Sequence, residues 1–189
     1  MRRIGILGDI GSGKTYVAKC FGFPVFNADL EVAKIYKNDK KVFQKLKKGL
    51  PQYFNSFPIK KKEIIKAILS NKKNLKKIIK IVHYEVRKKM NDFLKKNKHK
   101  KLVILDVPLL LENKINKKKD ILIFVESKKS EILKRLKKRK NFNLKIFNNF
   151  KKIQLSLAFK KKRSQFIIKN NFKKNSVKIR IKEIKKNLI

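Results

Sequence analysis

The sequence predicts an α/β fold built around a parallel sheet of five short strands. Three apolar runs carry this prediction, over residues 3–7, 102–107 and 121–125. The two later runs are continuously apolar up to Asp106 in the first and throughout the second, as expected for strands that helices cover on both faces of a parallel sheet. Segments with the apolar spacing of helices separate the runs, so strands and helices should alternate in a doubly wound, three-layer arrangement.

The first half of the chain begins with this alternation and then becomes helical. The strand at 3–7 is followed by a helical pattern over 14–21, a second short strand over 25–27 and a helix over about 29–36. Between 39 and 97 the apolar spacing predicts three or four amphipathic helices. We expect these helices to form an insertion in the sheet domain.

The second half returns to the alternation of strands and helices. It predicts further helices over 130–138, 142–159 and 177–188, and a fifth strand over 166–168. A chain of 189 residues has the size of one compact domain. We therefore expect a single domain over residues 1–189.

The chain carries a strong positive charge. Its 55 Lys and Arg residues against 13 Asp and Glu residues give a formal net charge of +42, which attracts polyanions such as nucleic acid. The cations are spread over almost the whole chain after residue 33, without a focused RNA-binding motif. Lys, Asn and Ile, all with A/T-rich codons, make up 89 residues, so base-composition drift can supply the excess. We expect only non-specific contact with nucleic acid.

Cysteine usage and apolar runs indicate the cellular setting. The single cysteine, Cys20, cannot form an intramolecular disulfide, and no Cys/His cluster has the spacing of metal ligands. No apolar run approaches the roughly 18 residues that span a bilayer, and the N-terminus lacks the pattern of a signal peptide. We expect a soluble, monomeric protein of the cytoplasm with no membrane partner.

One motif indicates nucleotide binding. Residues 8–15 match G-x-x-x-x-G-K-S/T, the P-loop pattern, between a predicted strand and a predicted helix. The glycines let successive backbone N–H groups cradle the β-phosphate, the lysine reaches the β- and γ-phosphates, and the threonine hydroxyl ligates Mg²⁺. The sequence therefore predicts that ATP and Mg²⁺ bind at Gly8, Asp9, Ile10, Gly11, Ser12, Gly13, Lys14 and Thr15.

The residues of this loop stand out from the composition of the chain. Four of the six glycines lie between residues 5 and 13, and Thr15 is the only threonine. A glycine-rich turn that merely joins strand to helix is the alternative interpretation. Asp9 places a carboxylate near the expected polyphosphate, although its side chain could point outward to solvent.

Two aspartates are candidates for the remaining chemistry of a P-loop kinase, which needs a carboxylate near Mg²⁺ and the acceptor hydroxyl. Asp29 and Asp106 both follow apolar runs, at the edge of a parallel sheet where α/β proteins bind ligands. Asp29 could instead, or also, cap the N-terminus of the following helix. Asp106 could simply end a strand in the turn before Pro108.

Two arginines suggest a lid over the nucleotide. Arg135 and Arg139 are four residues apart on a predicted helix, so they would share one face that could close over the ATP phosphates. Arginine is scarce in this chain, with seven residues in all, and its planar fork suits transition-state stabilisation. Arg139 is the preferred catalytic candidate, and a solvated helix face is the alternative.

Several segments resemble the dephospho-coenzyme A kinase family, and together they cover nearly the whole chain. Residues 4–15 are similar to the family's I-G-L-T-G-G-I-G-S-G-K-S, residues 24–29 to P-V-I-D-A-D and residues 106–112 to D-x-P-L-L-F-E. Residues 81–87 resemble L-x-H-P-x-V-R. The lid helix and the adenine-side strand of the family have weaker counterparts in Arg135 to Arg139, Gln154 and Asn170.

This resemblance implies ATP-dependent phosphorylation of the 3′-hydroxyl of dephospho-coenzyme A, the last step of coenzyme A synthesis. It implies a helical substrate subdomain over 39–97 and a lid region over about 139–160. The implied catalytic residues are Asp29 as base, Lys14 and Arg139, with Thr15 on the metal. Arg135 and Asn170 would bind the nucleotide, and the acceptor would be held by His83, Arg87, Asp106 and Leu110.

Three departures of the sequence from the family pattern bear on its activity. Asn27 replaces an aspartate, Tyr84 replaces a proline, and Asp9 replaces a glycine. Two other functions stay open from the sequence. One is a different small-molecule or nucleoside monophosphate kinase, against which residues 106–112 argue. The other is a basic nucleic-acid-binding NTPase.

Overall fold

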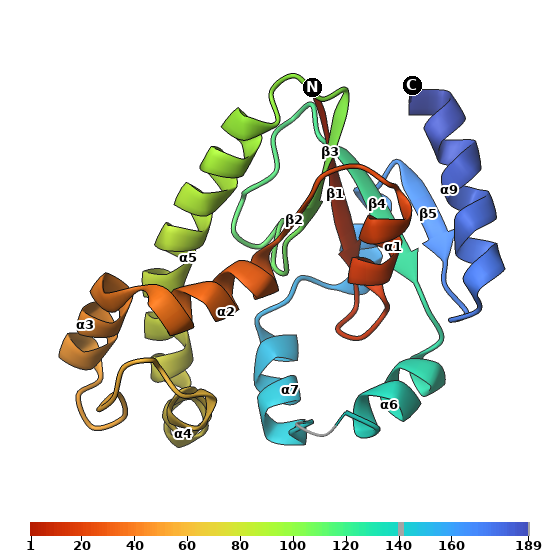
Figure 1. The fold of residues 1–189 in the computed structure, drawn as a ribbon. Coiled ribbons are helices and arrows are strands. Elements are labelled where there is room, and N and C mark those ends of the chain that lie inside the picture. The colour runs from red at the N-terminus through yellow and green to blue at the C-terminus, as the bar shows by residue number, and fades with distance from the viewer. Residues whose placement is uncertain (140–141, 189) are drawn as a thin grey trace. The chain divides into compact units, whose positions relative to one another are not determined.

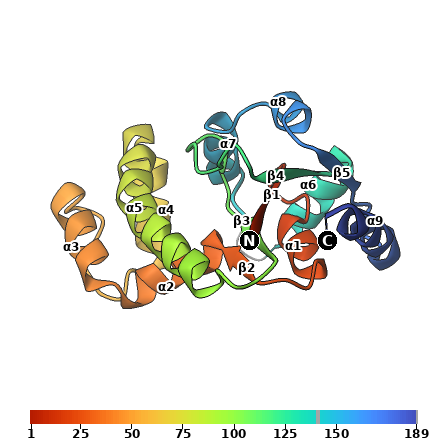
Figure 2. The same cartoon turned by 90° about the horizontal axis from the view of Figure 1, so that it is seen from above.

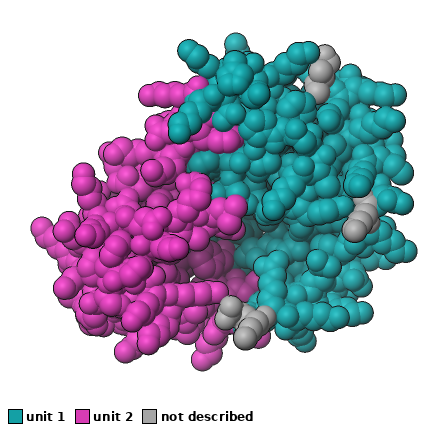
Figure 3. Space-filling view, viewed as in Figure 1, with its two compact units in different colours: residues 1–27, 96–142, 151–189 teal, residues 28–95, 143–150 magenta. Residues whose placement is uncertain are grey.

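A computed structural model describes residues 1–139 and 142–188 and shows a five-stranded sheet with helices around it (Figure 1). The chain divides into two compact units, coloured separately in Figure 3. The sheet unit contains Met1–Asn27, Lys96–Phe142 and Lys151–Ile189. The helical unit contains Ala28–Lys95 and Asn143–Phe150.

The sheet is entirely parallel, as the sequence predicts, with strand order β2-β3-β1-β4-β5. Its register places Ile4 of the central strand beside Ile104 on one side and Ile121 on the other. This order brings the ends of β1, β2 and β3 together at one edge. The strands are β1 (Arg2–Gly8), β2 (Val25–Asn27), β3 (Leu102–Asp106), β4 (Ile121–Glu126) and β5 (Phe166–Lys169).

Helices cover both faces of the sheet, which explains why the strands are apolar away from their ends. In Figure 2, α1 (Lys14–Cys20) and α9 (Lys174–Leu188) lie on one side of the sheet and α8 (Leu157–Lys162) on the other. Alternate residues of each strand face opposite sides. The core under α1 and α9 is fully buried and includes Ile4, Ile6, Val17, Phe21, Ile104, Ile123, Ile168 and Ile184.

The opposite face of β1 shows how closely this sheet is packed. Leu110 and Leu122 pack against Gly5, where an added Cβ would lie 2.5 Å from Leu110 and 3.0 Å from Leu122. Leu110 is only 1% exposed, so it is a core residue and its expected contact with the acceptor is not supported by its burial.

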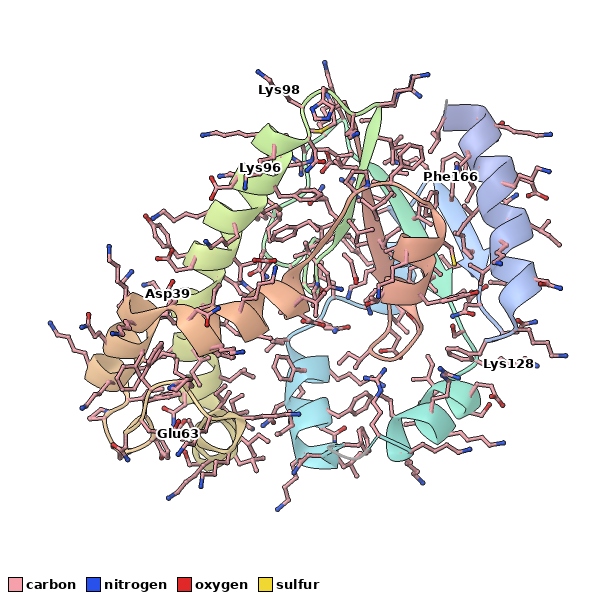
Figure 4. The ribbon with its side chains drawn as sticks, viewed as in Figure 1. Asp39, Glu63, Lys96, Lys98, Lys128 and Phe166 are labelled. Carbon is pink, nitrogen blue, oxygen red and sulfur yellow. The ribbon has the colours of Figure 1, made fainter. Side chains whose placement is uncertain are left out.

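The helical unit begins with α2 (Ala28–Asn38) and α3 (Lys40–Gly49), which are followed by α4 (Lys61–Ser70) and α5 (Lys72–Lys96). Asp39, labelled in Figure 4 at the start of α3, caps that helix by accepting from the Val42 N–H at 3.0 Å. At α4 the direction is reversed, because Glu63 lies in the first turn and accepts from the N–H of Lys60, the N-cap residue, at 2.9 Å. Apolar residues of this unit, including Val42, Leu46, Phe54, Ala67, Leu75 and Ile78, are buried.

The single helix predicted over 142–159 is wrong, because the structure has two. These are α7 (Leu144–Lys152) and α8, and the break falls at residues 153–156. Ser156 starts the second helix, since its Oγ accepts from the Phe159 N–H at 3.2 Å. A serine that bonds to backbone N–H groups competes with helix continuation, and the apolar period alone does not reveal this.

Within the described parts of the chain, none of the helices has the length and apolar character that crossing a membrane requires. The same residues hold no group of three or more His, Cys, Asp or Glu side chains arranged to bind a metal ion.

Candidate functional site

The centre of the candidate site is the loop between β1 and α1. Gly8, Gly11 and Gly13 all have positive φ angles, of 146°, 85° and 89°, which residues with a Cβ rarely adopt. A Cβ at Gly8 would lie 2.6 Å from the Val125 carbonyl oxygen, and one at Gly13 would lie 2.3 Å from Asn170 Nδ2. Glycine is therefore required at both positions, and the loop has the cradle that a bound phosphate needs.

Lys14 lies across this loop. Its Nζ donates to the carbonyl oxygens of Asp9 at 2.7 Å and Gly8 at 3.3 Å. Phosphate oxygens are stronger acceptors for an ammonium group than neutral carbonyls. The lysine is thus placed at the mouth of the cradle, where it can exchange these carbonyls for a phosphate.

Asp9 is buried within the loop, so its side chain does not take the outward position that the sequence left open. The residue is 8% exposed, and its Oδ1 accepts from the Ile10 N–H at 2.7 Å. This short bond to the next amide keeps the carboxylate against its own backbone.

Three side chains meet at the ends of β2, β3 and α1. The Thr15 hydroxyl donates to Asp106 Oδ2 at 2.6 Å, and Asn27 Nδ2 donates to the same oxygen at 2.6 Å. Asp106 is 3% exposed, so these bonds compensate for much of the cost of burying its charge. A hydroxyl and a carboxylate in this relation are the pair that P-loop enzymes use to hold Mg²⁺.

This geometry accounts for Asn27, which stands where the family pattern has aspartate. An amide can donate to the Asp106 carboxylate, whereas a second ionised carboxylate could only accept. The strand pairing of Asn27 with Asp106 fixes the contact, because the two residues are register partners in β2 and β3.

Asn170 and Ser127 support the loop from the far side. Asn170 is 2% exposed and donates through Nδ2 to the Ser12 carbonyl oxygen at 2.8 Å, and its Oδ1 accepts from the Phe172 N–H at 2.9 Å. Ser127 Oγ donates to the same Ser12 oxygen at 3.0 Å. Sequence reasoning missed Ser127, because a single serine after β4 belongs to no motif.

Arg135 and Arg139 do not share a helical face as expected. Arg135 lies in α6 (Lys129–Lys137), and its guanidinium stacks 4.4 Å from the centroid of the Phe172 ring. Arg139 lies beyond the end of α6. Its N–H donates to the Leu136 carbonyl oxygen at 3.0 Å, three residues back, in a turn that is tighter than that of an α-helix. The expected lid over 139–160 includes residues 140–141, which lie outside the described residues.

The remaining candidates belong to the helical unit. Asp29 is the second residue of α2, which begins at Ala28, so it lies inside the first turn rather than at the N-cap. A carboxylate there is favoured by the helix dipole. His83 is partly buried and Arg87 is exposed, and both lie on α5.

The sequence did not predict a buried ion pair that involves the last residue of the segment 106–112. Lys160 Nζ lies 2.7 Å from Glu112 Oε1, with exposed side-chain fractions of 4% and 9%. The Leu155 N–H donates to the same carboxylate oxygen at 3.0 Å, and Lys160 also donates to Gln154 Oε1 at 3.2 Å. The pair thereby attaches the segment between α7 and α8 to the loop that follows β3.

The family model and the curated relatives agree on one family. The family model described as dephospho-CoA kinase matches residues 2–176. A dephospho-CoA kinase of Wolbachia pipientis wMel is 35% identical over 186 residues, covering 96% of this chain and 95% of that protein.

Two solved structures share the fold. The crystal structure of TT1252 from Thermus thermophilus has a TM-score of 0.80 at 25% identity and covers 100% of this chain and 98% of that one. Dephospho-CoA kinase from Campylobacter jejuni has a TM-score of 0.65 at 20% identity, with 99% and 97% covered.

Proposed function

This chain belongs to the dephospho-CoA kinase family, and we propose that it transfers the γ-phosphate of ATP to the 3′-hydroxyl of dephospho-coenzyme A. The observation that carries the proposal is the family match over residues 2–176, which includes the glycine cradle and the Thr15–Asp106 pair. The match argues against the other two functions that the sequence leaves open.

The phosphate donor would bind at the loop between β1 and α1. Backbone N–H groups of residues 8–15 and the Lys14 ammonium would hold the β- and γ-phosphates. Thr15 and Asp106 fit a magnesium ion, because Mg²⁺ is bound through one or two protein oxygens together with substrate phosphates. The ion would supply neutralisation of the charge on those phosphates.

The acceptor chemistry would depend on Asp29. Only Ala28 separates Asp29 from Asn27, so chain connectivity alone keeps their Cα atoms within about 7 Å. Asp29 would accept the proton of the 3′-hydroxyl. At the same time the hydroxyl oxygen would form a bond to the γ-phosphorus, and the bond from that phosphorus to the leaving ADP would break. Arg139 would neutralise the charge that develops.

Other residues would hold the two substrates. Residues 39–97, with His83 and Arg87 on α5, would bind dephospho-coenzyme A, and residues 139–160 would form a lid. Asn170 and Arg135 would lie on the nucleotide side. We further propose that the enzyme uses Mg²⁺ and acts as a monomer in the cytoplasm.

A coupled assay of ADP release tests this function. Protein purified at high salt, to remove bound nucleic acid, should release ADP from ATP with Mg²⁺ when dephospho-coenzyme A is added, and far less with AMP or adenosine. Lys14→Ala should lower kcat/KM about 100-fold or more, because a charge that stabilises the transition state is lost. Lys19→Ala, an exposed lysine on the same helix, is the matched control.

The proposal fails if ADP release does not depend on dephospho-coenzyme A, or if Lys14→Ala and Lys19→Ala behave alike.

A further inference from the structure

A cavity between α1 and α9 is lined mainly by lysines. The two helices lie side by side on one face of the sheet (Figures 1 and 2), and both belong to the sheet unit. The cavity has a volume of about 400 Å³, which is within the usual range for sites that bind small molecules. It is lined by Cys20, Lys178, Ile181, Lys182, Lys185 and Lys186.

The four lysines of this cavity form one stripe along α9. Positions 178, 182, 185 and 186 have the spacing of neighbours on a helix surface, and like charges at such spacing destabilise a helix. The adjoining stripe of Val177, Ile181 and Ile184 is buried in the core of the sheet unit. The core therefore fixes how α9 is turned, and with it the direction in which the lysine stripe faces.

No carboxylate neutralises this lysine stripe. Among the described residues, none of its four ammonium groups lies within 4.0 Å of a carboxylate oxygen. Glu183, the one acidic residue of α9, pairs instead with Arg180 at 2.6 Å. Lys185 contacts the Phe23 ring, with its Nζ 5.1 Å from the centroid, which leaves its charge in place. The four cations therefore repel one another, and an anion in the cavity would remove that repulsion.

We propose that this cavity is a second anion-binding site, and that its ligand is a small molecule with a chain of linked phosphates. A lysine ammonium binds phosphate as a point charge, without the fixed fork geometry of arginine. The stripe extends over about 12 Å of helix, so a single phosphate or carboxylate cannot contact all four lysines, whereas several linked phosphates can. No acidic side chain lines the cavity to repel such a chain.

This second site is separate from the phosphate loop. Lys14 and Cys20 are the first and last residues of α1, so about 9 Å of helix axis lies between them. A phosphate chain in the cavity would leave the loop free for ATP. The inference therefore does not depend on which acceptor the enzyme phosphorylates.

The reactivity of Cys20 measures the field in this cavity, because Cys20 is the only cysteine of the chain. Its thiolate attacks one sulfur of a disulfide reagent, forms a mixed disulfide and releases the other half as a coloured thiolate. The anionic reagent dithiobis-nitrobenzoate should react about tenfold faster with the wild type than with Lys178→Gln/Lys182→Gln, because the lysines concentrate anions in the cavity. The neutral reagent dithiodipyridine should react with both at nearly the same rate.

Lys62→Gln/Lys66→Gln is the matched control for this measurement. It removes two exposed lysines that are also four apart, on α4 of the helical unit. The net charge of the chain falls by the same amount, and the reaction of Cys20 with either reagent should stay as in the wild type.

Protection of Cys20 tests the ligand itself. At low salt and without Mg²⁺, inorganic tripolyphosphate at about ten times its dissociation constant should slow the reaction with the neutral reagent about tenfold, by mass action. Protection should persist in Lys14→Ala, whose phosphate loop is impaired, and should be lost in Lys178→Gln/Lys182→Gln. Stronger protection of Lys14→Ala by ATP would identify a nucleotide as the ligand, and stronger protection by tripolyphosphate an inorganic phosphate chain.

Four results would overturn the second site. One is the absence of protection by tripolyphosphate, and another is its loss in Lys14→Ala, which would assign the ligand to the phosphate loop. Equal effects of the two double variants would show only the diffuse charge of the chain, and equal slowing of both reagents would show that the lysines act on the thiol alone. Failure to phosphorylate dephospho-coenzyme A, with protection of Cys20 intact, would refute the proposed function and leave this site standing.

Discussion

The Thr15 hydroxyl and the Asp106 carboxylate lie 2.6 Å apart, from Oγ1 to Oδ2, although 91 positions separate them in the chain. The parallel pairing of β1 with β3 makes this possible, because it brings the ends of both strands to one edge of the sheet. The only threonine of the protein thus meets one of its six aspartates.

The first prediction is that Asp106→Asn removes metal-dependent activity. The amide keeps the shape of the side chain but carries no charge, so Mg²⁺ loses its protein carboxylate. We expect kcat to fall by more than the roughly 10- to 100-fold that follows loss of a partner outside the metal's own ligands. ATP binding without Mg²⁺ should change little. Steady-state kinetics across Mg²⁺ concentrations measure this, with the exposed Asp92→Asn as control. Wild-type kcat at saturating Mg²⁺ would contradict the assignment.

The second prediction concerns Asn27→Asp, which restores the residue of the family pattern. The change replaces a donor to Asp106 by a like charge, so the metal-free protein should lose about 1–3 kcal/mol of unfolding free energy. Mg²⁺ with ATP should recover part of this loss, because a cation between two carboxylates removes their repulsion.

Urea unfolding with and without Mg²⁺ and ATP gives the comparison. Asn27→Ala is the control, since it removes the same donor without adding a charge. Mg²⁺ and ATP should raise its unfolding free energy by no more than they raise that of the wild type. Equal recovery in Asn27→Ala and Asn27→Asp would show that the second carboxylate does not reach the metal.

Local patterns were enough to predict the phosphate loop and the sheet. The glycine spacing of residues 8–15 specifies its own conformation, because each glycine takes a φ angle that other residues rarely adopt. The apolar runs of β3 and β4 identify buried strands because helices cover both faces. These predictions depend on neighbours in sequence, and the structure confirms them.

Contacts between distant side chains could not be predicted in the same way. Asn170 bonds to Ser12 across 158 positions, and Glu112 pairs with Lys160 only because α8 packs against the sheet. In a chain with 48 lysines, nothing in the sequence indicates that Lys160 is buried. The helix break before Ser156 and the early end of α6 before Arg139 depend on single hydrogen bonds, which the apolar period does not record.

The third prediction uses the buried Glu112–Lys160 pair. Lys160→Met should destabilise the fold by about 3–5 kcal/mol, because it leaves the Glu112 carboxylate buried without its cation. Lys161→Met is a matched control on the next residue. Lys161 pairs with Glu126 at 2.6 Å, but with side chains 45% and 35% exposed, so its loss should cost about 0–1 kcal/mol.

The double variant Lys160→Met/Glu112→Gln should recover part of the stability lost in Lys160→Met, since the uncompensated charge is removed. Urea unfolding of both single variants and the double variant measures the coupling. A cost for Lys160→Met no larger than that for Lys161→Met would mean that the pair does not stabilise the fold.

The fourth prediction concerns tyrosine ionisation at alkaline pH. Burial raises the pKa of Tyr36 from 10.0 to about 12, whereas hydrogen bonds with Gln52 and Ser70 lower the pKa of Tyr53. Below pH 10 the Tyr36 hydroxyl is protonated in the folded and the unfolded chain, and its contribution to stability is fully present. As the pH rises from 10 to about 12, the unfolded chain ionises first, and that contribution is lost.

Ultraviolet absorbance of tyrosinate during a pH titration measures this, with circular dichroism to show that the chain stays folded. Tyr36→Phe should remove the component that ionises last, and Tyr53→Phe should remove one that ionises early. Tyr36→Phe should also flatten the fall in unfolding free energy between pH 10 and 12. If the last component persists in Tyr36→Phe while the protein is folded, the Tyr36 hydroxyl is not held in a buried environment.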